Sequence, residues 1–268
     1  MIRMIATDLD GTLLATGGMS VPERNLKALA RAVSLGVRVV VCTGRMFVGG
    51  QRFAQLVPGD QPVICVNGAV VRMSRSLRYV RRIGVSPDLA QAVLELMRQA
   101  GAKPWFYIGD ICYAEELTES LQALLNRTGV DGQIVDRLDP LTVQRPEKIF
   151  CTMTPEATAE LRARVTAELG ASLYITLSHP YQLEVLAPEA TKGAALAMTA
   201  ADLGIAKDEI AAFGDNLNDL ELFDSAGIRV AMGNAEDELK HKADLIAPSN
   251  DEGGVGAIVE QLLDGQMQ

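Results

Sequence analysis

A short apolar run, Met4-Ile5-Ala6, leads directly into the segment Asp8-Leu9-Asp10-Gly11-Thr12-Leu13. Two carboxylates two residues apart therefore stand where a buried strand is expected to end, and the glycine after them frees the backbone to turn. Burying two acids side by side is costly unless a cation or a proton neutralises them. A simple turn would explain a bare Asp-x-Asp, but similar polar clusters follow other apolar runs downstream. The pattern therefore predicts a chemical site at the end of a strand.

Strand-like and helix-like segments alternate in the first and last parts of the chain, which indicates a parallel α/β sheet. In the first part we expect strands over 3–7, 37–42 and 62–66, and a helix over 21–35. Ser20 and Glu23 have capping-box spacing at the start of that helix, and Gly36 can end it. In the last part we expect helices over 193–203, 219–226 and near the C-terminus, with strands over 210–213, 229–232 and 245–246.

The middle of the chain has a different pattern. Two short segments within 70–83 flank Ser74-Arg75-Ser76, which is a hairpin signal. Beyond it we expect helices over 86–101 and 155–169, with strands near 105–108, 148–152, 173–176 and 182–186. This order does not continue the parallel sheet. We therefore expect an α/β fold in which residues 1–83 and 186–268 form a parallel-sheet core and residues 84–185 form an α+β insert.

Composition argues against several classes of protein. The 268 residues carry a formal net charge of −9, whereas general nucleic-acid binding needs a basic face. No apolar run approaches the roughly 20 residues needed to span a bilayer, and the N-terminus carries no signal-peptide pattern. The only histidines, His179 and His241, argue against a histidine-based zinc site or a Ser-His-Asp triad. The cysteines are widely spaced, which indicates reduced core residues of a cytoplasmic protein: Cys42, Cys65, Cys112 and Cys151.

Polar residues follow each strand expected in the core. Because the carboxyl ends of parallel strands line the ligand crevice of an open sheet, these residues should converge on one edge. In chain order the clusters are Asp8 and Asp10, Thr43-Gly44-Arg45, Asn67-Gly68, Gly214-Asp215 with Asn218-Asp219, and Gly233-Asn234. Lys192 precedes the helix that leads into the strand over 210–213. Any single cluster fits a turn, but turn preference does not explain why all of them share one edge.

These side chains suit phosphoryl transfer to an aspartate. A carboxylate can attack phosphorus and form an aspartyl phosphate, and a second acid beside it can protonate the leaving alkoxide and then activate water. Since an anion attacks an anion, charge must be neutralised: Mg²⁺ prefers hard oxygen ligands, and Lys192 adds a fixed positive charge. Thr43 offers a hydroxyl donor, and Gly44 lets backbone N–H groups approach phosphate oxygens.

From end to end the chain resembles the haloacid-dehalogenase-like phosphatase superfamily. Four motifs of that superfamily stand in order: Asp8-Leu9-Asp10-Gly11-Thr12, Thr43, Lys192 and Gly214-Asp215-x-x-Asn218-Asp219. The insert between the second and third motifs is similar to the α+β cap of the Cof-type group. The tail carries two segments that resemble signatures of that group, Val230-Ala231-Met232-Gly233-Asn234-Ala235 and Ser249-Asn250-Asp251-Glu252. The resemblance implies a Rossmann-like core with an inserted cap that selects the substrate.

The resemblance also implies a role for each motif residue. Asp8 would be the nucleophile and Asp10 the general acid and base, with Thr43 and Lys192 completing the catalytic set. The Asp8 carboxylate, the Asp10 backbone carbonyl and Asp215 would hold Mg²⁺, and Asp219 would support that site. The phosphate group would be bound by Thr43, Gly44, Lys192, Asn218 and the Leu9 backbone. Glu189 and Leu222 depart from the group, which often has glycine and methionine there, but neither departure removes a chemical group.

The expected function is a Mg²⁺-dependent phosphatase of small phosphorylated metabolites, sugar phosphates first, with neither a nucleic-acid nor a membrane partner. We expect a monomer or a weak homodimer. A phosphomutase is an alternative, but only roughly 30 residues separate Asp10 from Thr43, too few for the early helical cap that mutases of this superfamily usually carry. A catalytically weak sugar-phosphate-binding regulatory protein is another alternative, which the intact acids, lysine and metal motif disfavour.

Overall fold

β1 (Met4–Asp8) is buried along its whole length and lies in the middle of an eight-stranded sheet. The computed structural model, which describes residues 1–266, orders that sheet β14-β13-β12-β1-β2-β3-β4-β5. The other strands are β2 (Arg38–Cys42), β3 (Pro62–Cys65), β4 (Val70–Met73), β5 (Tyr79–Arg82), β12 (Ile210–Gly214), β13 (Ile228–Ala231) and β14 (Leu245–Ile246). The neighbouring strands from β14 to β3 pair in parallel. The hairpin β4–β5 extends one edge, and β4 is antiparallel to both β3 and β5. The expected α/β class and hairpin are therefore confirmed.

The chain crosses this sheet in two directions from β1. It first passes to β2 and β3 on one side, and later returns to β12, β13 and β14 on the other. In such a sheet the ligand crevice opens where the strand order reverses, at the carboxyl ends of the strands. Asp8 ends β1 and Gly214 ends the neighbouring β12, so the crevice lies over these two strand ends.

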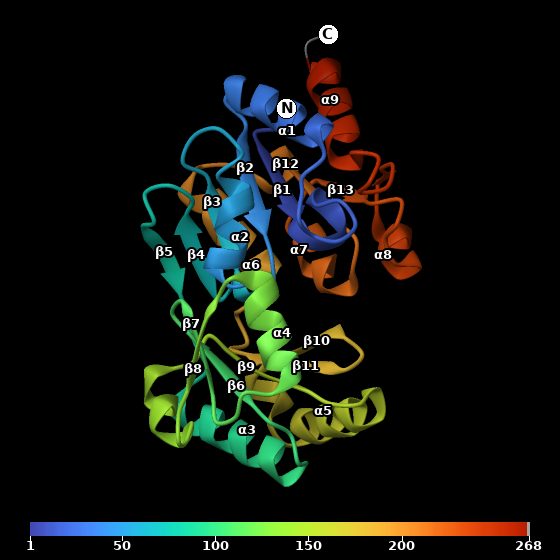
Figure 1. Cartoon of the computed structure of the whole chain (residues 1–268). Coiled ribbons are helices and arrows are strands. Elements are labelled where there is room, and N and C mark those ends of the chain that lie inside the picture. The colour runs from blue at the N-terminus through green and yellow to red at the C-terminus, as the bar shows by residue number, and fades with distance from the viewer. Residues whose placement is uncertain (267–268) are drawn as a thin grey trace.

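Helices cover the eight-stranded sheet, which occupies the upper half of Figure 1. The N-terminal and C-terminal helices pack against each other, and α6 packs against α7. Their bounds are α1 (Glu23–Ser34), α2 (Phe47–Ala54), α6 (Lys192–Asp202), α7 (Leu220–Asp224), α8 (Asp237–Lys242) and α9 (Gly254–Gln266). Within residues 1–266, none of the helices combines the length and the apolar character that crossing a bilayer requires.

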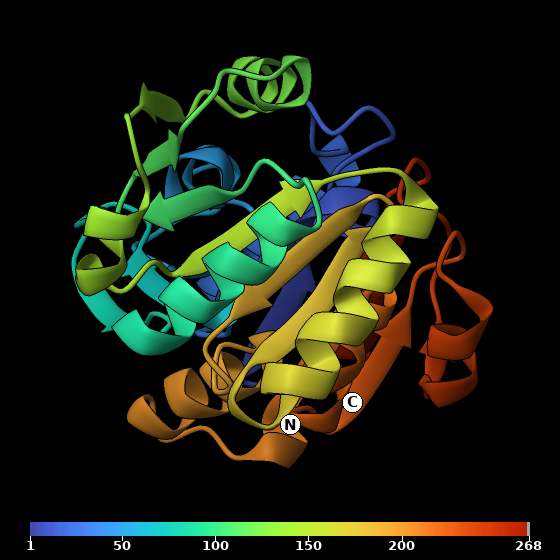
Figure 2. The ribbon, with the colours of Figure 1, turned by 90° about the horizontal axis from the view of Figure 1, so that it is seen from below.

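A second, six-stranded sheet forms the lower half of Figure 1, in the order β10-β11-β9-β6-β7-β8. Its strands are β6 (Trp105–Ile108), β7 (Ile111–Ala114), β8 (Asp131–Ile134), β9 (Lys148–Thr152), β10 (Tyr174–His179) and β11 (Gln182–Leu186). Figure 2 shows α3 (Pro87–Gln99) and α5 (Pro155–Leu169) side by side on the outer face of this sheet. α4 (Glu119–Thr128) lies toward the first sheet instead, as Figure 1 shows.

Alternation along β9 explains how the second sheet faces the first. Ile149 and Cys151 belong to an apolar cluster with residues of α3 and α5. Lys148 and Phe150, one residue out of phase, point to the opposite face, because successive side chains of a strand alternate. That face carries polar and aromatic side chains and looks toward the strand ends of the first sheet. The division into a core (1–83 and 186–268) and a cap (84–185) that act as separate units stays a prediction.

The predicted capping box of the first helix is wrong. Pro22 is the N-cap of α1, and no side chain caps the helix there. Ser20 is instead held in the preceding loop, where its carbonyl oxygen accepts a hydrogen bond of 2.9 Å from the Ala15 N–H. The predicted end is close: α1 ends at Ser34, and Gly36 follows with a φ of +84°.

Several elements escaped the sequence patterns: α2, α4, α8, β7 and β8. In α2, the pair Gly49-Gly50 lowers helix propensity and hides the periodicity. The structure gives the reason for one of these glycines, because a Cβ atom on Gly50 would lie 3.1 Å from the Thr43 side chain. β8 is exposed at all its positions, so it shows no alternation of apolar and polar residues.

The cysteines lie in the core, as expected. Cys42, Cys65, Cys112 and Cys151 are buried free thiols. Burial raises the pKa of each thiol above its ordinary value, because it disfavours the thiolate. They are therefore inert core residues, and none of them is suited to metal binding or nucleophilic chemistry.

Candidate active site

The backbone after β1 is shaped so that two acids from distant segments can meet. Gly11 has a φ of +77°, and a Cβ atom there would lie 2.3 Å from a carboxylate oxygen of Asp215. Only glycine therefore allows the loop after Asp8 to pass beneath Asp215. The Thr12 hydroxyl then donates a 2.7 Å hydrogen bond to Asp215 Oδ1 and fixes the orientation of that carboxylate. The Asp-x-Asp-Gly-Thr segment thus ends the strand and also contacts the Asp215 carboxylate through Gly11 and Thr12.

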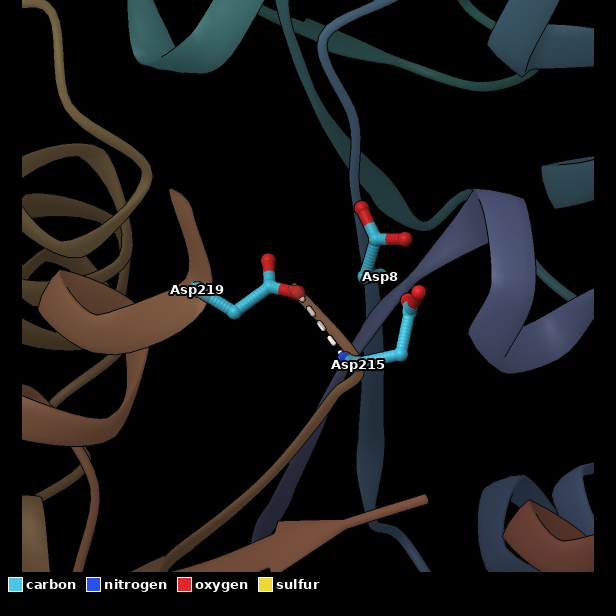
Figure 3. Close-up of side chains that lie close together, drawn as sticks. All are labelled: Asp8, Asp215 and Asp219. Carbon is cyan, nitrogen blue, oxygen red and sulfur yellow. Dashed lines mark hydrogen bonds between the residues drawn. The ribbon is translucent and has the colours of Figure 1, made fainter. Parts of the chain in front are cut away.

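Three carboxylates converge at this point. Oxygen atoms of Asp8, Asp215 and Asp219 all lie within 4.8 Å of one another, and Figure 3 shows the three side chains grouped beyond the end of β1. Asp219 Oδ2 accepts hydrogen bonds from the backbone N–H groups of Asp215 and Asn216, at 3.1 and 3.2 Å. Asp219 therefore holds the loop that carries Asp215. Asp8 and Asp215 each accept a side-chain hydrogen bond at Oδ1, which leaves Oδ2 of each as the candidate ligand.

Lys192 lies behind this cluster and is almost completely buried. Its ammonium group donates to Asp8 Oδ1 at 2.5 Å and to Asp219 Oδ1 at 2.6 Å. The Thr191 hydroxyl caps the helix that carries Lys192 by accepting from the Ala194 N–H at 3.1 Å. One buried lysine thus faces three acids, which leaves an excess of negative charge in the cluster.

The pKa values of the acids reflect that excess. Burial raises the pKa of Asp8 well above its ordinary value, against the opposing effect of Lys192. Burial, followed by the negative charge of Asp219, raises the pKa of Asp215 to about 7. Acids that resist ionisation in this way are relieved by a cation, and the donors are all hard oxygens rather than thiolate or imidazole. The cluster therefore fits a divalent cation such as Mg²⁺ or Ca²⁺.

The loop after β2 lies beside Asp8, and residues of both line one cavity. Thr43 is 1% exposed, and its hydroxyl oxygen accepts a hydrogen bond from the Arg45 N–H at 3.1 Å. A Cβ atom on Gly44 would lie 2.8 Å from Oδ1 of Asn67, so glycine is needed for this close approach. Asn67 itself has a φ of +52°, a left-handed conformation that costs about 1–3 kcal/mol and is typical of functional sites.

Asp10 lines the same cavity as Asp8 and is held by a residue to which sequence reasoning gave no role. Its side chain is 53% exposed, and both of its oxygens are bound by Arg45, with Arg45 Nε 2.7 Å from Asp10 Oδ2. Arg45 Nη1 is buried and has no hydrogen-bond partner among the described residues. The only sequence signal for this contact was the place of Arg45 directly after Thr43-Gly44.

A cavity of about 590 Å³ joins these groups. Of the predicted site residues, six line it: Asp8, Asp10, Thr43, Gly44, Asp215 and Asn218. Leu9, Lys192 and Asp219 are buried and lie behind the lining. The second sheet supplies the opposite wall, and its lining residues include a buried ion pair that sequence reasoning missed, Lys148 with Glu184. The alternation in Lys148-Ile149-Phe150-Cys151-Thr152 is the sequence signal that could have shown that Lys148 and Phe150 share one face of the strand.

Comparison with known proteins decides the family. The family model described as haloacid dehalogenase-like hydrolase matches residues 5–259, which is nearly the whole chain. The chain belongs to this family. Haloacid dehalogenase-like phosphatases generally use a metal ion, and the acidic cluster at the end of β1 agrees with that general property.

Several relatives of this haloacid dehalogenase-like hydrolase are named as phosphatases. The chain is 30% identical over 288 residues to the 5-amino-6-(5-phospho-D-ribitylamino)uracil phosphatase YwtE of Bacillus subtilis, and the match covers 99% of each protein. It is 27% identical to the pyridoxal phosphate phosphatase YbhA of Escherichia coli, over 92% of this chain and 94% of the relative. A haloacid dehalogenase-like hydrolase structure from Bacteroides thetaiotaomicron superposes with a TM-score of 0.88 at 23% identity, covering 98% and 100% of the chains. The expected phosphoric monoester hydrolase with the fold of this family is confirmed.

Proposed function

We propose that this phosphatase is Mg²⁺-dependent and hydrolyses small phosphorylated metabolites through an aspartyl phosphate on Asp8. One observation carries the proposal: Asp8 is a buried acid that opens onto a cavity, held by Lys192 at 2.5 Å and grouped with Asp215. Sugar phosphates are the first substrate class and phosphorylated cofactors the second. The second class is supported by the relatives that act on a ribitylamino uracil phosphate and on pyridoxal phosphate.

The reaction follows from the chain's own side chains. An Asp8 oxygen attacks phosphorus, and the bond between phosphorus and the ester oxygen breaks. Asp10 enters the reaction protonated and gives that proton to the leaving alkoxide, and Arg45 binds both oxygens of the carboxylate that results. Asp10 then takes a proton from water, the water oxygen attacks phosphorus, and the bond to Asp8 breaks. Inorganic phosphate leaves and both acids return to their starting states.

Charge and orientation come from the surrounding groups. Lys192 offsets the negative charge of Asp8 as the phosphate dianion approaches. The Thr43 hydroxyl, the Gly44 and Leu9 backbone N–H groups and the Asn218 amide bind the phosphate oxygens. The Asp8 carboxylate, the Asp10 backbone carbonyl and Asp215 would hold Mg²⁺, supported by Asp219. When bound, Mg²⁺ neutralises charge on the phosphoryl oxygens.

Residues 84–185 act in this proposal as a cap over the reacting groups. The cavity has walls from both sheets, so an enclosed substrate would be shielded from bulk water while the phosphoryl group is on Asp8. This arrangement favours substrates that fit within about 590 Å³ and disfavours phosphoproteins and nucleic acids. The net charge of −9 adds to the exclusion of nucleic acids.

Metal removal tests the proposed function. We expect phosphate release from p-nitrophenyl phosphate and from a panel of sugar phosphates with MgCl₂, none in excess chelator, and full recovery when MgCl₂ is restored. Ca²⁺ should bind but support little turnover, because its larger and looser coordination misplaces the nucleophile. Full activity after exhaustive chelation would contradict the metal requirement. Binding of phosphate esters without any phosphate release would favour a regulatory protein instead.

Asp215→Asn tests the metal site without an activity readout. Since the native pKa of Asp215 is about 7 and its ordinary value is 3.8, the native state binds the extra proton between these pH values, and stability falls as pH rises through that range. At pH 8 in chelator, the variant should therefore unfold at a higher temperature than the wild type. Each kcal/mol added to the free energy of unfolding raises the unfolding temperature by about 2–4 °C. MgCl₂ should raise the unfolding temperature of the wild type and leave the variant nearly unchanged.

The matched control is Asp202→Asn, an exposed acid at the end of α6. It should behave as the wild type both in chelator and with MgCl₂. A variant at Asp215 that keeps the full thermal response to MgCl₂ would remove Asp215 from the metal site.

A further inference from the structure

A buried ion pair in the second sheet reaches across to the first. Lys148 on β9 and Glu184 on β11 are 3% and 4% exposed, and Lys148 Nζ lies 3.1 Å from Glu184 Oε1. Lys148 Nζ also donates to the Gly44 carbonyl oxygen at 3.1 Å. Glu184 Oε2 accepts from the Asn67 side-chain amide at 2.7 Å. The pair therefore touches the loop that is proposed to bind phosphate, and it lines the same cavity as Asp8.

Fold stability alone does not explain this pair. Replacing a buried ion pair by apolar residues of similar volume is often neutral or stabilising, because desolvating two charges costs about as much as their attraction returns. The surroundings offer an apolar alternative, since Lys148 Nζ lies 4.9 Å from the centroid of the Tyr107 ring and 5.4 Å from that of Phe150. Charged groups on an aromatic wall of a cavity are typical of ligand recognition.

A second observation points to a missing ligand group. Asn67 is 2% exposed, and its Oδ1 has no hydrogen-bond partner among the described residues. A buried acceptor left unpaired costs about 1–3 kcal/mol, so a donor from a ligand would relieve it. The strained backbone of Asn67, with a φ of +52°, fixes this acceptor beside Gly44 and Glu184.

The donors and acceptors around this point define a ligand chemistry. Glu184 and Asn67 offer acceptors, and so does the oxygen of the Ser178 hydroxyl, which donates its own proton within the protein and lies 3.0 Å from Glu184 Oε1. Lys148 offers the N–H that it does not use on Glu184 and Gly44. A hydroxyl group donates one hydrogen bond and accepts others, so neighbouring hydroxyls on a carbon chain match such a mixed set. An unsubstituted alkyl or phenyl group would leave Asn67 Oδ1 without a partner, and a second phosphate would meet the charge of Glu184.

We propose that Lys148, Glu184 and Asn67 bind hydroxyl groups on the carbons next to the scissile phosphate, so that this enzyme selects phosphate esters of polyhydroxylated alcohols. This inference rests on the proposed phosphatase function and assigns its specificity to three residues from both sheets. The Lys148 contact with the Gly44 carbonyl keeps the hydroxyl site next to the phosphate site, as the short carbon chain of such an ester requires.

The test compares esters of equal length with and without hydroxyls. The pairs are erythritol 4-phosphate with butyl phosphate, ribitol 5-phosphate with pentyl phosphate, and sorbitol 6-phosphate with hexyl phosphate. Because hydrogen bonds to charged groups are stronger than those between neutral groups, the wild type should favour at least one hydroxylated ester by about tenfold or more in kcat/KM. In Lys148→Met/Glu184→Gln, which leaves no single buried charge, this preference should fall to about threefold or less.

The alkyl esters are the internal control, because they lack the hydroxyls and measure only the loss that arises through the Lys148 contact with the Gly44 loop. The favoured hydroxylated ester should lose at least about threefold more kcat/KM than its alkyl partner. An equal loss for both members of each pair would show that Lys148 and Glu184 only hold the two sheets together, and would overturn the proposal. So would a wild type without any preference for hydroxyls. Thermal unfolding of the variant checks that it is folded. If the double variant unfolds, Ser178→Ala provides a milder change, because it removes one acceptor next to Glu184 and leaves the ion pair intact.

A binding measurement separates this inference from the proposed function. Asp8→Asn protein with MgCl₂ is titrated by calorimetry with the same ester pairs and with inorganic phosphate. We expect the favoured hydroxylated ester to bind about tenfold more tightly than its alkyl partner. Equal affinities would overturn the hydroxyl site whether or not the wild type shows turnover. A clear binding preference in a protein without turnover would contradict only the proposed hydrolysis.

Discussion

Asp8→Asn should reduce phosphate release to the background rate. The carboxamide has nearly the shape of the carboxylate but is not a nucleophile toward phosphorus, so the covalent step is lost. The fold should survive, because Lys192 keeps its 2.6 Å contact with Asp219 and the crowded acidic cluster loses one negative charge. Steady-state assays with p-nitrophenyl phosphate and sugar phosphates measure the first effect, and thermal unfolding measures the second.

The same assays on Asp202→Asn provide the matched control, and this exposed acid on α6 should keep the wild-type rate. Wild-type turnover by Asp8→Asn would remove Asp8 from the role of nucleophile. Loss of turnover together with a large fall in unfolding temperature would indicate a structural role, so both readouts are needed.

Asp10→Asn should lower kcat by about 10²–10⁴-fold for sugar phosphates, which is the usual range for the loss of a general acid. The fall should be much smaller for p-nitrophenyl phosphate, since its leaving group needs little protonation. Asp10 is half exposed and paired with Arg45, so its replacement should have little effect on the unfolding temperature. The ratio of the two losses is the informative quantity.

Equal losses on both substrates would contradict proton donation by Asp10 and would indicate a role in positioning instead. Arg45→Lys is the companion variant, because lysine keeps the charge but cannot bind both oxygens of Asp10 in a fork. It should show a weaker form of the same pattern, with a larger loss for sugar phosphates than for p-nitrophenyl phosphate.

Much of the fold was predictable because its signals are local. β1, β2, β3 and β12 are short, buried strands, and each was visible as an apolar run within one or two residues of its true bounds. α2 was not visible, because the glycine that fits against Thr43 also weakens the helical pattern. The capping box at Ser20 had the right spacing but was wrong, since the loop before α1 uses Ser20 for its own hydrogen bond.

Sequence patterns located Asp8, Asp10, Thr43 and Asp215, because polar residues at the ends of parallel strands converge whatever the details of packing. Lys192 was found by its place at the start of the helix that leads into β12. The contacts that orient and surround them depend on segments far apart in the chain. Asp10 and Arg45 are 35 residues apart, and Asn67 and Glu184 are 117 residues apart. No local pattern encodes such pairs. The first arises where the loops after β1 and β2 meet, and the second only when the second sheet packs over the strand ends of the first. The chemistry can therefore be inferred from the strand-end motifs, whereas only tertiary packing decides which residues form the cavity wall opposite them.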